Sequence, residues 1–178
     1  MKNSMKASAM IALMFILAGC ENEQAPFDKD DIERMVYQHA KAWETGDKEL
    51  LETLLHEDVV FAYPGRRLNK TQTLDDLDYF AENFNETRVY TNKIIIANAD
   101  VAVEWQFATT SKGSGKRQVV NDAIIARIED GKFIVWKEYL DGRVKLLQET
   151  GELYLEEGEE PYPWPLKTES YGRKHSTK

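Results

Sequence analysis

Apolar residues recur at helical spacing in the segment 30–55. Between residues 30 and 45 they recur every three or four positions, the pattern of a helix with one buried face. Asp30 and Asp31 open this segment, where a helix N-terminus favours acids. Gly46-Asp47 interrupts the pattern, and the leucines of 50–55 then predict a short second helix. The stripe of the first helix is Ile32, Met35, Val36, His39, Ala40 and Trp43.

A strand and a third helix are expected next. Residues 59–63 (VVFAY) are β-branched, aromatic or small and stop at Pro64-Gly65, which predicts a strand. Asn69 and Gln72 have the spacing of a capping box, in which each side chain bonds the backbone N–H of the other residue. The buried stripe of the helix that follows is Leu74, Leu77, Phe80, Ala81 and Phe84.

From residue 88 the hydrophobic period changes from that of a helix to the two-residue period of strands. The candidate strands are 88–97, 100–110, 116–129 and 132–140. Short turns rich in Gly, Asn and Asp separate them, as in β-hairpins. Helices followed by an antiparallel meander predict an α+β fold.

The first twenty residues have the pattern of a signal peptide. Lys2 and Lys6 precede an uncharged apolar run at 7–17, and small residues then lead into Cys20. A helix needs about 20 apolar residues to span a bilayer, so this run predicts a removed signal rather than an anchor helix. Cys20 is the single cysteine of the chain, which excludes disulfides and cysteine metal sites from the remainder.

The sequence Leu17-Ala18-Gly19-Cys20 resembles the lipobox of bacterial lipoproteins. The resemblance implies that Cys20 is acylated and becomes the first residue of the mature protein, held at the membrane by its lipid. Glu21 follows the cysteine, and in a Gram-negative host this implies the periplasmic face of the outer membrane. The expected location is therefore the cell envelope.

Charge and composition divide the rest of the chain. The net charge is −8, and it becomes −10 without the two lysines of the signal, so nucleic acid is not an expected partner. Residues 21–29 are polar and predict a tether, and 30–150 form the predicted domain. The segment 151–178 is acidic and then rich in proline and aromatic residues; we expect a loose tail whose aromatic side chains find some cover.

Two motifs carry a family resemblance over residues 30–149. Trp43-x-x-Gly46-Asp47, followed by Glu57-Asp58-Val59-Val60-Phe61-x-x-Pro64-Gly65, resembles the opening of the nuclear transport factor 2-like superfamily, and more narrowly its SnoaL-like and ketosteroid isomerase group. The segment 130–141 is similar to the last hairpin of that family. The resemblance implies a cone in which a curved antiparallel sheet wraps about three N-terminal helices and leaves a pocket on its concave face.

The resemblance also implies which side chains face that pocket. Matching strand positions to the family places two acids, Asp122 and Glu138, in an otherwise apolar and aromatic pocket. Such a pocket suits a small hydrophobic ligand. The aromatic positions implied to line it are Phe61, Tyr63, Trp105, Phe107 and Trp136.

The family's catalytic residues are only partly present. Tyr63 and Ile124 occupy the positions of the two ketosteroid isomerase acids. Glu138 matches an aspartate of limonene-epoxide hydrolases, whose other polar residues are replaced here by Trp105 and Phe107.

The candidate catalytic residues are therefore Glu138, Asp122 and Tyr63, and each has a structural alternative. Glu138 could belong to a buried hydrogen-bond network. Asp122 could be a solvated acid near the pocket mouth, and Tyr63 could be a core tyrosine with a satisfied hydroxyl.

Two functions stay open at this point. One is a lipid-anchored envelope protein that binds a small hydrophobic or carbonyl-containing molecule, with weak acid–base activity of a cyclase, isomerase or hydrolase kind. The other is a non-catalytic module that forms a homodimer or binds a protein through its open sheet face, as the superfamily commonly does. The three histidines do not have the spacing of metal ligands, and no cofactor-binding motif is present. The sequence therefore predicts neither a bound metal ion nor a cofactor.

Overall fold

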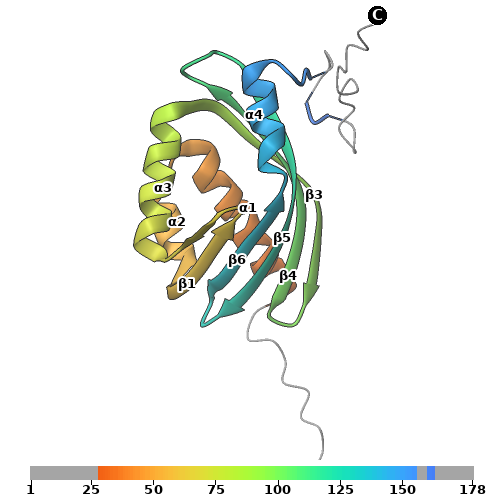
Figure 1. Cartoon of the computed structure of the whole chain (residues 1–178). Coiled ribbons are helices and arrows are strands. Elements are labelled where there is room, and N and C mark those ends of the chain that lie inside the picture. Colours follow the sequence, from red (N-terminus) through yellow and green to blue (C-terminus); the bar gives the residue numbers. More distant parts are fainter. Residues whose placement is uncertain (1–27, 156–159, 163–178) are drawn as a thin grey trace, which may run out of the picture.

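Six strands form one curved sheet in the computed structural model, which describes residues 28–155 and 160–162 (Figure 1). The order across the sheet is β2-β1-β6-β5-β4-β3. The predictions for the signal 1–20, Cys20, most of the tether, and tail residues 156–159 and 163–178 lie outside the described residues. The strands are β1 (Leu55–Tyr63), β2 (Arg66–Leu68), β3 (Phe84–Ala97), β4 (Asp100–Ser111), β5 (Arg117–Glu129) and β6 (Lys132–Leu140).

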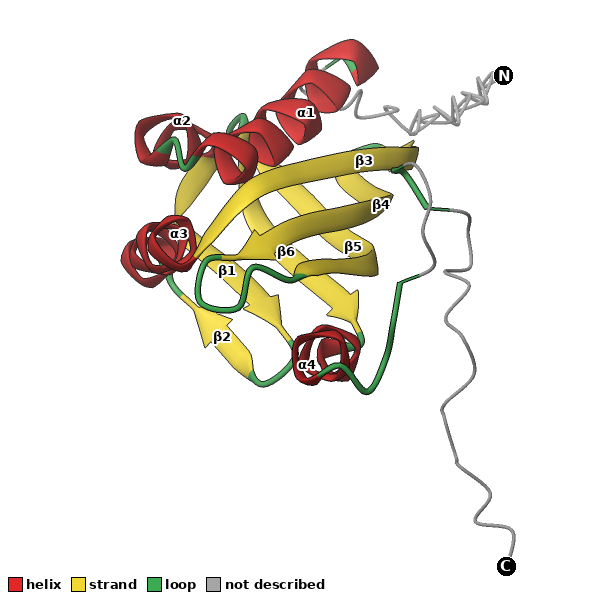
Figure 2. Cartoon of the chain, turned by 90° about the horizontal axis from the view of Figure 1, so that it is seen from above, coloured by secondary structure: helices red, strands yellow, loops and turns green. Residues whose placement is uncertain are grey.

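Three helices precede or interrupt the first strands, and a fourth follows the last strand. They are α1 (Lys29–Thr45), α2 (Lys48–Leu54), α3 (Lys70–Asn83) and α4 (Gly142–Thr150). Figure 2 shows α1 and α4 at opposite sides of the molecule, with the strands between them. Of the helices in the described ranges, none has the length and apolar content needed to cross a membrane.

Local sequence sets the helix ends. Gly46 ends α1 in the left-handed region (φ 67°), which glycine adopts without strain, and Asp47 then accepts a hydrogen bond from the Leu50 N–H at 2.9 Å to start α2. The capping box predicted for α3 is confirmed. Asn69 accepts from the Gln72 N–H at 2.9 Å, and the Gln72 side chain accepts from the Asn69 N–H at 3.0 Å.

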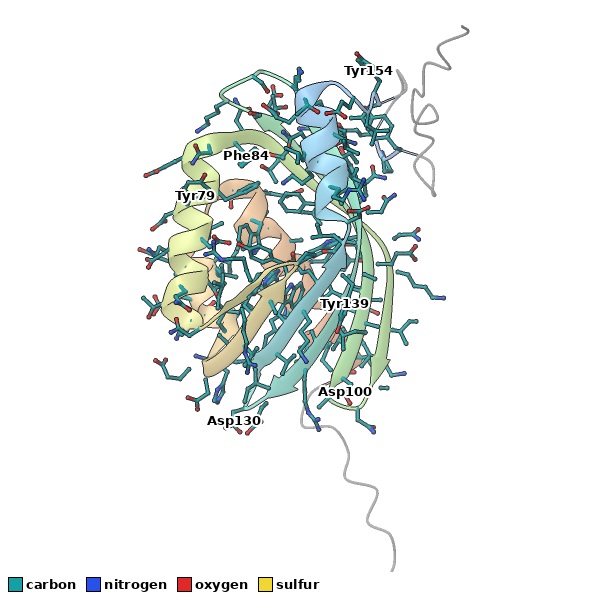
Figure 3. The ribbon with its side chains drawn as sticks, viewed as in Figure 1. Tyr79, Phe84, Asp100, Asp130, Tyr139 and Tyr154 are labelled. Atoms are coloured by element: carbon teal, nitrogen blue, oxygen red, sulfur yellow. The ribbon has the colours of Figure 1, made fainter. Side chains whose placement is uncertain are left out.

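The expected antiparallel meander is confirmed as β3-β4-β5-β6. Asn98 has a positive φ at the β3–β4 turn, and Asp130 and Gly131 both do at the β5–β6 turn, as a type I′ hairpin requires. Asp100 and Asp130 lie at the same end of the sheet (Figure 3). The α+β class and the curved sheet around the helices are as predicted.

The sheet is mixed rather than wholly antiparallel, which corrects the expectation. β1 runs parallel to β6, with Phe61 opposite Trp136. Parallel neighbours need a long connection, and the whole of α3 and β3–β5 lies between these two strands.

β1 also begins at Leu55, inside the segment expected to be helical. Leu55 is fully buried and pairs with Phe133, an environment that suits leucine in either kind of element.

A cluster of aromatic rings forms the core beside α1. His39 is completely buried there and stacks on Trp136 with ring centroids 3.8 Å apart. Neither ring nitrogen of His39 has a hydrogen-bond partner among the described residues. Burial lowers the pKa of His39 to about 3, so the imidazole is neutral at physiological pH.

Helix α4 is fixed to an open edge of β5. The β5 strand continues past its last pairing with β6, which leaves the backbone of Val119 without a strand neighbour on that side. Gln148 replaces the missing strand: its Oε1 accepts from the Val119 N–H at 2.9 Å, and its Nε2 donates to the Val119 carbonyl at 3.1 Å. This pair of bonds sets the position of α4 over the concave side.

The described part of the tail is attached to the sheet, so a loose tail is wrong for 151–155 and 160–162. Leu153 is buried. Glu160 accepts two hydrogen bonds from the Arg117 guanidinium, at 2.6 and 2.7 Å, and one from the Tyr90 hydroxyl at 2.9 Å. Charge-assisted bonds of this bidentate kind are strong enough to hold a segment that composition alone describes as polar.

Candidate functional site

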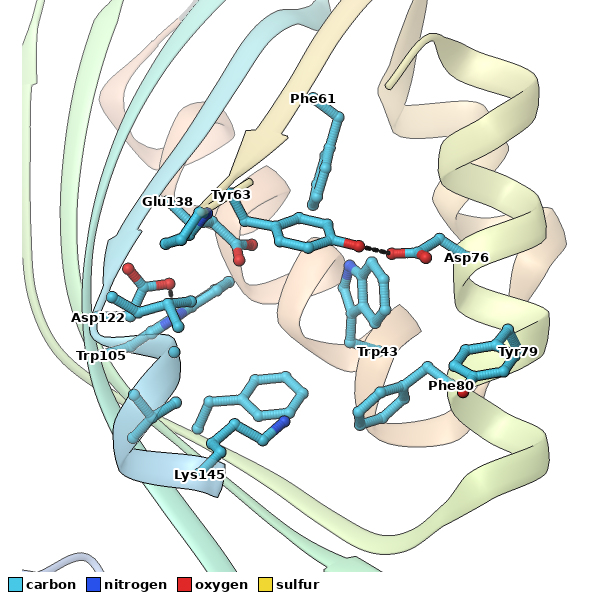
Figure 4. A pocket seen from close by; sticks show the side chains of 15 residues that line it. Trp43, Phe61, Tyr63, Asp76, Tyr79, Phe80, Trp105, Asp122, Glu138 and Lys145 are labelled. Atoms are coloured by element: carbon cyan, nitrogen blue, oxygen red, sulfur yellow. Dashed lines mark hydrogen bonds between the residues drawn. The ribbon is translucent and has the colours of Figure 1, made fainter. Parts of the chain in front are cut away.

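A cavity of about 310 Å³ lies on the concave face of the sheet, between it and helices α1, α3 and α4 (Figure 4). This volume is at the lower end of the range for small-molecule sites. Seven of its fifteen lining residues are aromatic, and four others are three acids and a lysine. The residues that line it are Trp43, Phe61, Tyr63, Pro64, Asp76, Tyr79, Phe80, Trp105, Phe107, Val120, Asp122, Glu138, Leu140, Gly142 and Lys145.

The structure brings together all but one of the side chains expected in the pocket. Phe61, Tyr63, Trp105 and Phe107 line the cavity with the two predicted acids. Trp136 does not line it. Its ring is fully buried in the core, where it stacks on His39 of the helix α1 that covers this part of the sheet.

Asp122 comes from β5 and is buried, so the alternative of a solvated acid at the pocket mouth is wrong. Its two oxygens are held separately: Oδ2 accepts from the Trp105 indole N–H at 3.3 Å, and Oδ1 accepts from the Tyr139 backbone N–H at 3.0 Å. Both donors belong to adjacent strands of the sheet. The carboxyl group is therefore fixed in orientation.

Glu138 comes from β6 and opens into the same cavity as Asp122. Asp122 pairs with Leu140 and Glu138 with Ile124, so the two acids are diagonal neighbours on one face of the sheet. One oxygen of Glu138 accepts from the Trp136 indole N–H at 3.0 Å. Within the described ranges, its other oxygen accepts no hydrogen bond and faces the cavity.

Burial raises the pKa of both acids. For Glu138 the nearby charge of Asp122 adds to the effect of burial, and the hydrogen bond from Trp136 opposes it. For Asp122 burial outweighs the hydrogen bonds from Trp105 and Tyr139. Two acids that disfavour each other's charge lose their protons in separate steps, so between these two steps the pair shares a single proton. One member is then an acid while the other is a base.

Tyr63 lies at the end of β1 and donates its hydroxyl proton to Asp76 of α3 at 2.9 Å (Figure 4). Burial and this hydrogen bond raise the pKa of Tyr63 to about 12, so the phenol stays protonated. The proton is engaged by Asp76, which leaves the phenol oxygen of Tyr63 to accept from a ligand. The hydroxyl is thus satisfied within the protein, as the structural alternative for Tyr63 expected.

Two ionisable wall residues, Asp76 and Lys145, were missed by sequence reasoning. Asp76 precedes Phe80 by four residues and so lies on the same face of α3 as that pocket aromatic. Lys145 lies in α4, which was not predicted. The signal for α4 was present in Asp141, which caps the helix by accepting from the Arg143 N–H at 3.0 Å.

The chemistry available in this cavity is proton transfer. Two acids, a phenol oxygen and an amine line one cavity rich in aromatic side chains. Within 28–155 and 160–162, acids and histidines do not gather in a group of three or more that could hold a metal ion.

Comparison with known proteins supports the fold and the family. Several solved structures are similar to this chain. They include an LEH-like epoxide hydrolase from M. tuberculosis, 18% identical, with a TM-score of 0.60 over 68% of this chain and 91% of that chain. A protein with a ketosteroid isomerase-like fold from Catenulispora acidiphila, in complex with trimethylamine, is 19% identical, with a TM-score of 0.61 over 65% and 92%.

A third similar structure is IdmH from Streptomyces antibioticus, a candidate polyketide cyclase. It is 18% identical, with a TM-score of 0.58 over 65% of this chain and 96% of that chain. At these identities the likeness shows the fold alone. No curated protein sequence matches the chain. The family model of the SnoaL-like domain matches residues 36–136, more than half of the chain, and the protein therefore belongs to the SnoaL-like domain family.

Proposed function

We propose that this protein binds a small hydrophobic, carbonyl-containing molecule and moves a proton on it. The observation that carries the proposal is the pair Asp122 and Glu138, which share one aromatic cavity and whose pKa values are both raised by burial. Pairs of acids with perturbed pKa values in a cleft are typical of acid–base sites. The fold is also that of proteins named as an epoxide hydrolase and a candidate cyclase.

The two acids have different roles in this proposal. Glu138 has an oxygen open to the cavity and acts as the base that removes a proton beside the ligand's carbonyl. Asp122 is held rigidly by Trp105 and Tyr139, and when it carries the shared proton it donates a hydrogen bond to the oxygen that becomes negative. The aromatic wall holds the apolar part of the ligand.

A probe that needs only proton abstraction tests this function. 5-Nitrobenzisoxazole is flat and largely apolar. When a base removes the one proton on its isoxazole ring, the N–O bond breaks and a coloured phenolate forms. We expect the protein to open it with saturation kinetics, and kcat to rise with pH through the raised pKa of the acid pair, because the base must be ionised. A rate equal to that of free acetate, without saturation, would contradict the proposal.

We also propose that the mature protein is anchored in the cell envelope through a lipid on Cys20. The support is the lipobox-like sequence and the single cysteine. Cys20→Ala removes the thiol that would be acylated, so labelling with a fatty-acid analogue should stop and the processed form should be lost. Membrane fractionation checks this, and a Cys20→Ala protein still membrane-bound at the normal mature mass would contradict it.

The alternative function of a dimerising module is favoured by one feature of the outer sheet face. Ile95, Ala102 and Ile125 form a row across β3, β4 and β5, and Tyr139 of β6 lies diagonally from Ile125. Ile95, Ile125 and Tyr139 are each about half exposed or more. This row fits a second copy of the same face, and a C2 dimer would cover it.

Charge in that row should prevent such a dimer. We expect Ile125→Lys to convert a dimer to a monomer in sedimentation velocity, with the thermal stability of the monomer little changed because the side chain is exposed. Ile94→Lys is not a suitable control because Ile94 packs against the core. Tyr37→Lys, at an exposed aromatic side chain of α1 outside the row, is a suitable control and should leave the dimer intact. A wild type that is monomeric at all concentrations would exclude this function.

A further inference from the structure

Lys145 places an amine inside the cavity among aromatic rings. Its Nζ lies 5.0 Å from the ring centroid of Phe84 and 5.8 Å from those of Phe80 and Phe107. Three elements supply these rings, since Phe80 is on α3, Phe84 begins β3 and Phe107 is on β4. Figure 4 shows the lysine reaching from α4 into the pocket, on the side opposite Tyr63.

The amine has none of the usual partners of a lysine. In the part of the chain that the structure describes, Lys145 makes neither a hydrogen bond nor an ion pair with a side chain, and rings are its contacts. The exposed Lys48 shows the ordinary arrangement, with carboxylates of Asp75 and Asp78 within ion-pair distance. A lysine kept in an aromatic site without a counter-ion is unlike a surface lysine and points to chemistry at nitrogen.

The environment favours the uncharged, nucleophilic form of this amine. Burial lowers the pKa of Lys145, and the charge of Glu138 offsets this in part. Each unit by which a lysine pKa falls makes the free amine about tenfold more abundant at a given pH below that pKa. Glu138 and Asp122 supply a proton donor and acceptor in the same cavity.

We infer that Lys145 forms an imine with the carbonyl carbon of the ligand, because its amine lies among aromatic rings in the cavity that the acid pair also lines, and it makes no hydrogen bond or ion pair with the described side chains. The inference rests on the proposed function and narrows the ligand class to small apolar aldehydes and ketones. It adds covalent chemistry to the proton transfer that the acid pair performs.

The step balances without an outside reagent. The amine nitrogen attacks the carbonyl carbon, a C–N bond forms as the π bond of the carbonyl opens, and the oxygen becomes a hydroxyl group when one proton passes to it from the nitrogen through the carboxyl group of Glu138. Glu138 in its protonated form gives a proton to that hydroxyl, which leaves as water when the C–O bond breaks. The nitrogen releases its own proton to the Glu138 carboxylate, so one carbonyl and one amine give one imine and one water.

Reductive trapping of the full chain tests the inference. The probe is 2-naphthaldehyde with sodium cyanoborohydride, which reduces an imine to a stable secondary amine that peptide mass spectrometry can locate. We expect Lys145 to be modified at least about tenfold faster than the exposed lysines, because burial lowers its pKa and leaves more of the amine uncharged. Lys145→Arg keeps the positive charge and should abolish the fast phase, whereas Lys137→Arg on the outer face of β6 should leave it unchanged.

Binding of the matched alcohol separates the two proposals. 2-Naphthalenemethanol has the same rings but no carbonyl, and its binding is followed by quenching of tryptophan fluorescence from Trp43 and Trp105. If the alcohol binds and Lys145 is modified no faster than Lys137, the imine is excluded and the binding pocket stands. If neither naphthalene compound binds or reacts, the imine is excluded and the proposed function fails with it. Circular dichroism of Lys145→Arg confirms that a lost fast phase does not come from a lost fold.

Discussion

Replacing Glu138 with glutamine is expected to abolish proton abstraction in the cavity and to make the domain more stable at alkaline pH. Glutamine keeps an oxygen that can accept from the Trp136 indole, so the core contact survives. It removes the base, and loss of a positioned general base lowers a rate by about 10²- to 10⁴-fold. If Glu138 instead has a structural role in a buried network, Glu138→Gln should make the domain less stable than wild type.

The pH dependence follows from the direction of the pKa shift. Because the pKa of Glu138 is raised in the folded state, wild-type stability is highest below the ordinary glutamate pKa of 4.5 and is lost as pH rises through the raised value. The uncharged glutamine has no such loss. The advantage of Glu138→Gln should therefore grow above about pH 4.5 and level off at about 1–2 kcal/mol, a figure kept small because the Glu138 side chain is only partly buried.

Urea unfolding at pH 5 and pH 9, together with the benzisoxazole assay, checks both effects. Glu129→Gln is the matched control, since Glu129 is exposed at the end of β5 and should change neither quantity. A Glu138→Gln protein that is destabilised by several kcal/mol at neutral pH would assign Glu138 to a structural network. An unchanged rate of benzisoxazole opening would show that Glu138 is not the base.

The second large effect is expected at the buried histidine. His39→Leu should protect the domain from acid, because wild-type His39 must stay neutral to remain in the core. Its pKa is lowered from 6.5 to about 3, so stability is complete above pH 6.5 and is lost as pH falls toward 3. At 1.36 kcal/mol per pKa unit, the loss that His39→Leu prevents reaches about 4 kcal/mol at the acid end.

Thermal melts of wild type and His39→Leu between pH 7 and pH 3.5 measure this effect. Near pH 7 the two proteins should be close in stability, since the lost stacking on Trp136 is offset by removal of two unpartnered buried nitrogens. His56→Gln is the control, because His56 is only partly buried at the start of β1. If wild type and His39→Leu lose stability equally as the pH falls, protonation of His39 does not destabilise the folded domain.

Much of the fold could be predicted because its signals are local. Turn residues such as Asn98 and Gly131, the cap at Asn69 and the two-residue period of 100–129 each act over a few positions. The parallel pairing of Phe61 with Trp136 depends on segments more than seventy positions apart, and no periodicity records it. The same is true of Gln148, whose partner is the backbone of Val119.

The site was predictable where strand alternation and the family likeness fix a direction. Asp122, Glu138, Tyr63, Phe61, Trp105 and Phe107 reach one cavity as expected. Trp136 shares the strand parity of Glu138 but is buried by α1, a tertiary contact that alternation cannot contain. Asp76 and Lys145 lie on helices, where three or four positions face the sheet and sequence alone does not say which of them meets a cavity.

The central claim is that Asp122 and Glu138 share one proton in the cavity near neutral pH. Carbon-13 NMR of labelled side-chain carboxyl groups measures this directly, with Asp122→Asn and Glu138→Gln used to assign the two signals. At pH 6.5 we expect the pair still to hold a proton. Removing either acid should lower the pKa of the acid that remains. That pKa should still lie above the ordinary value, because burial continues to raise it. Two carboxyl signals that both finish titrating below pH 5 would contradict the account.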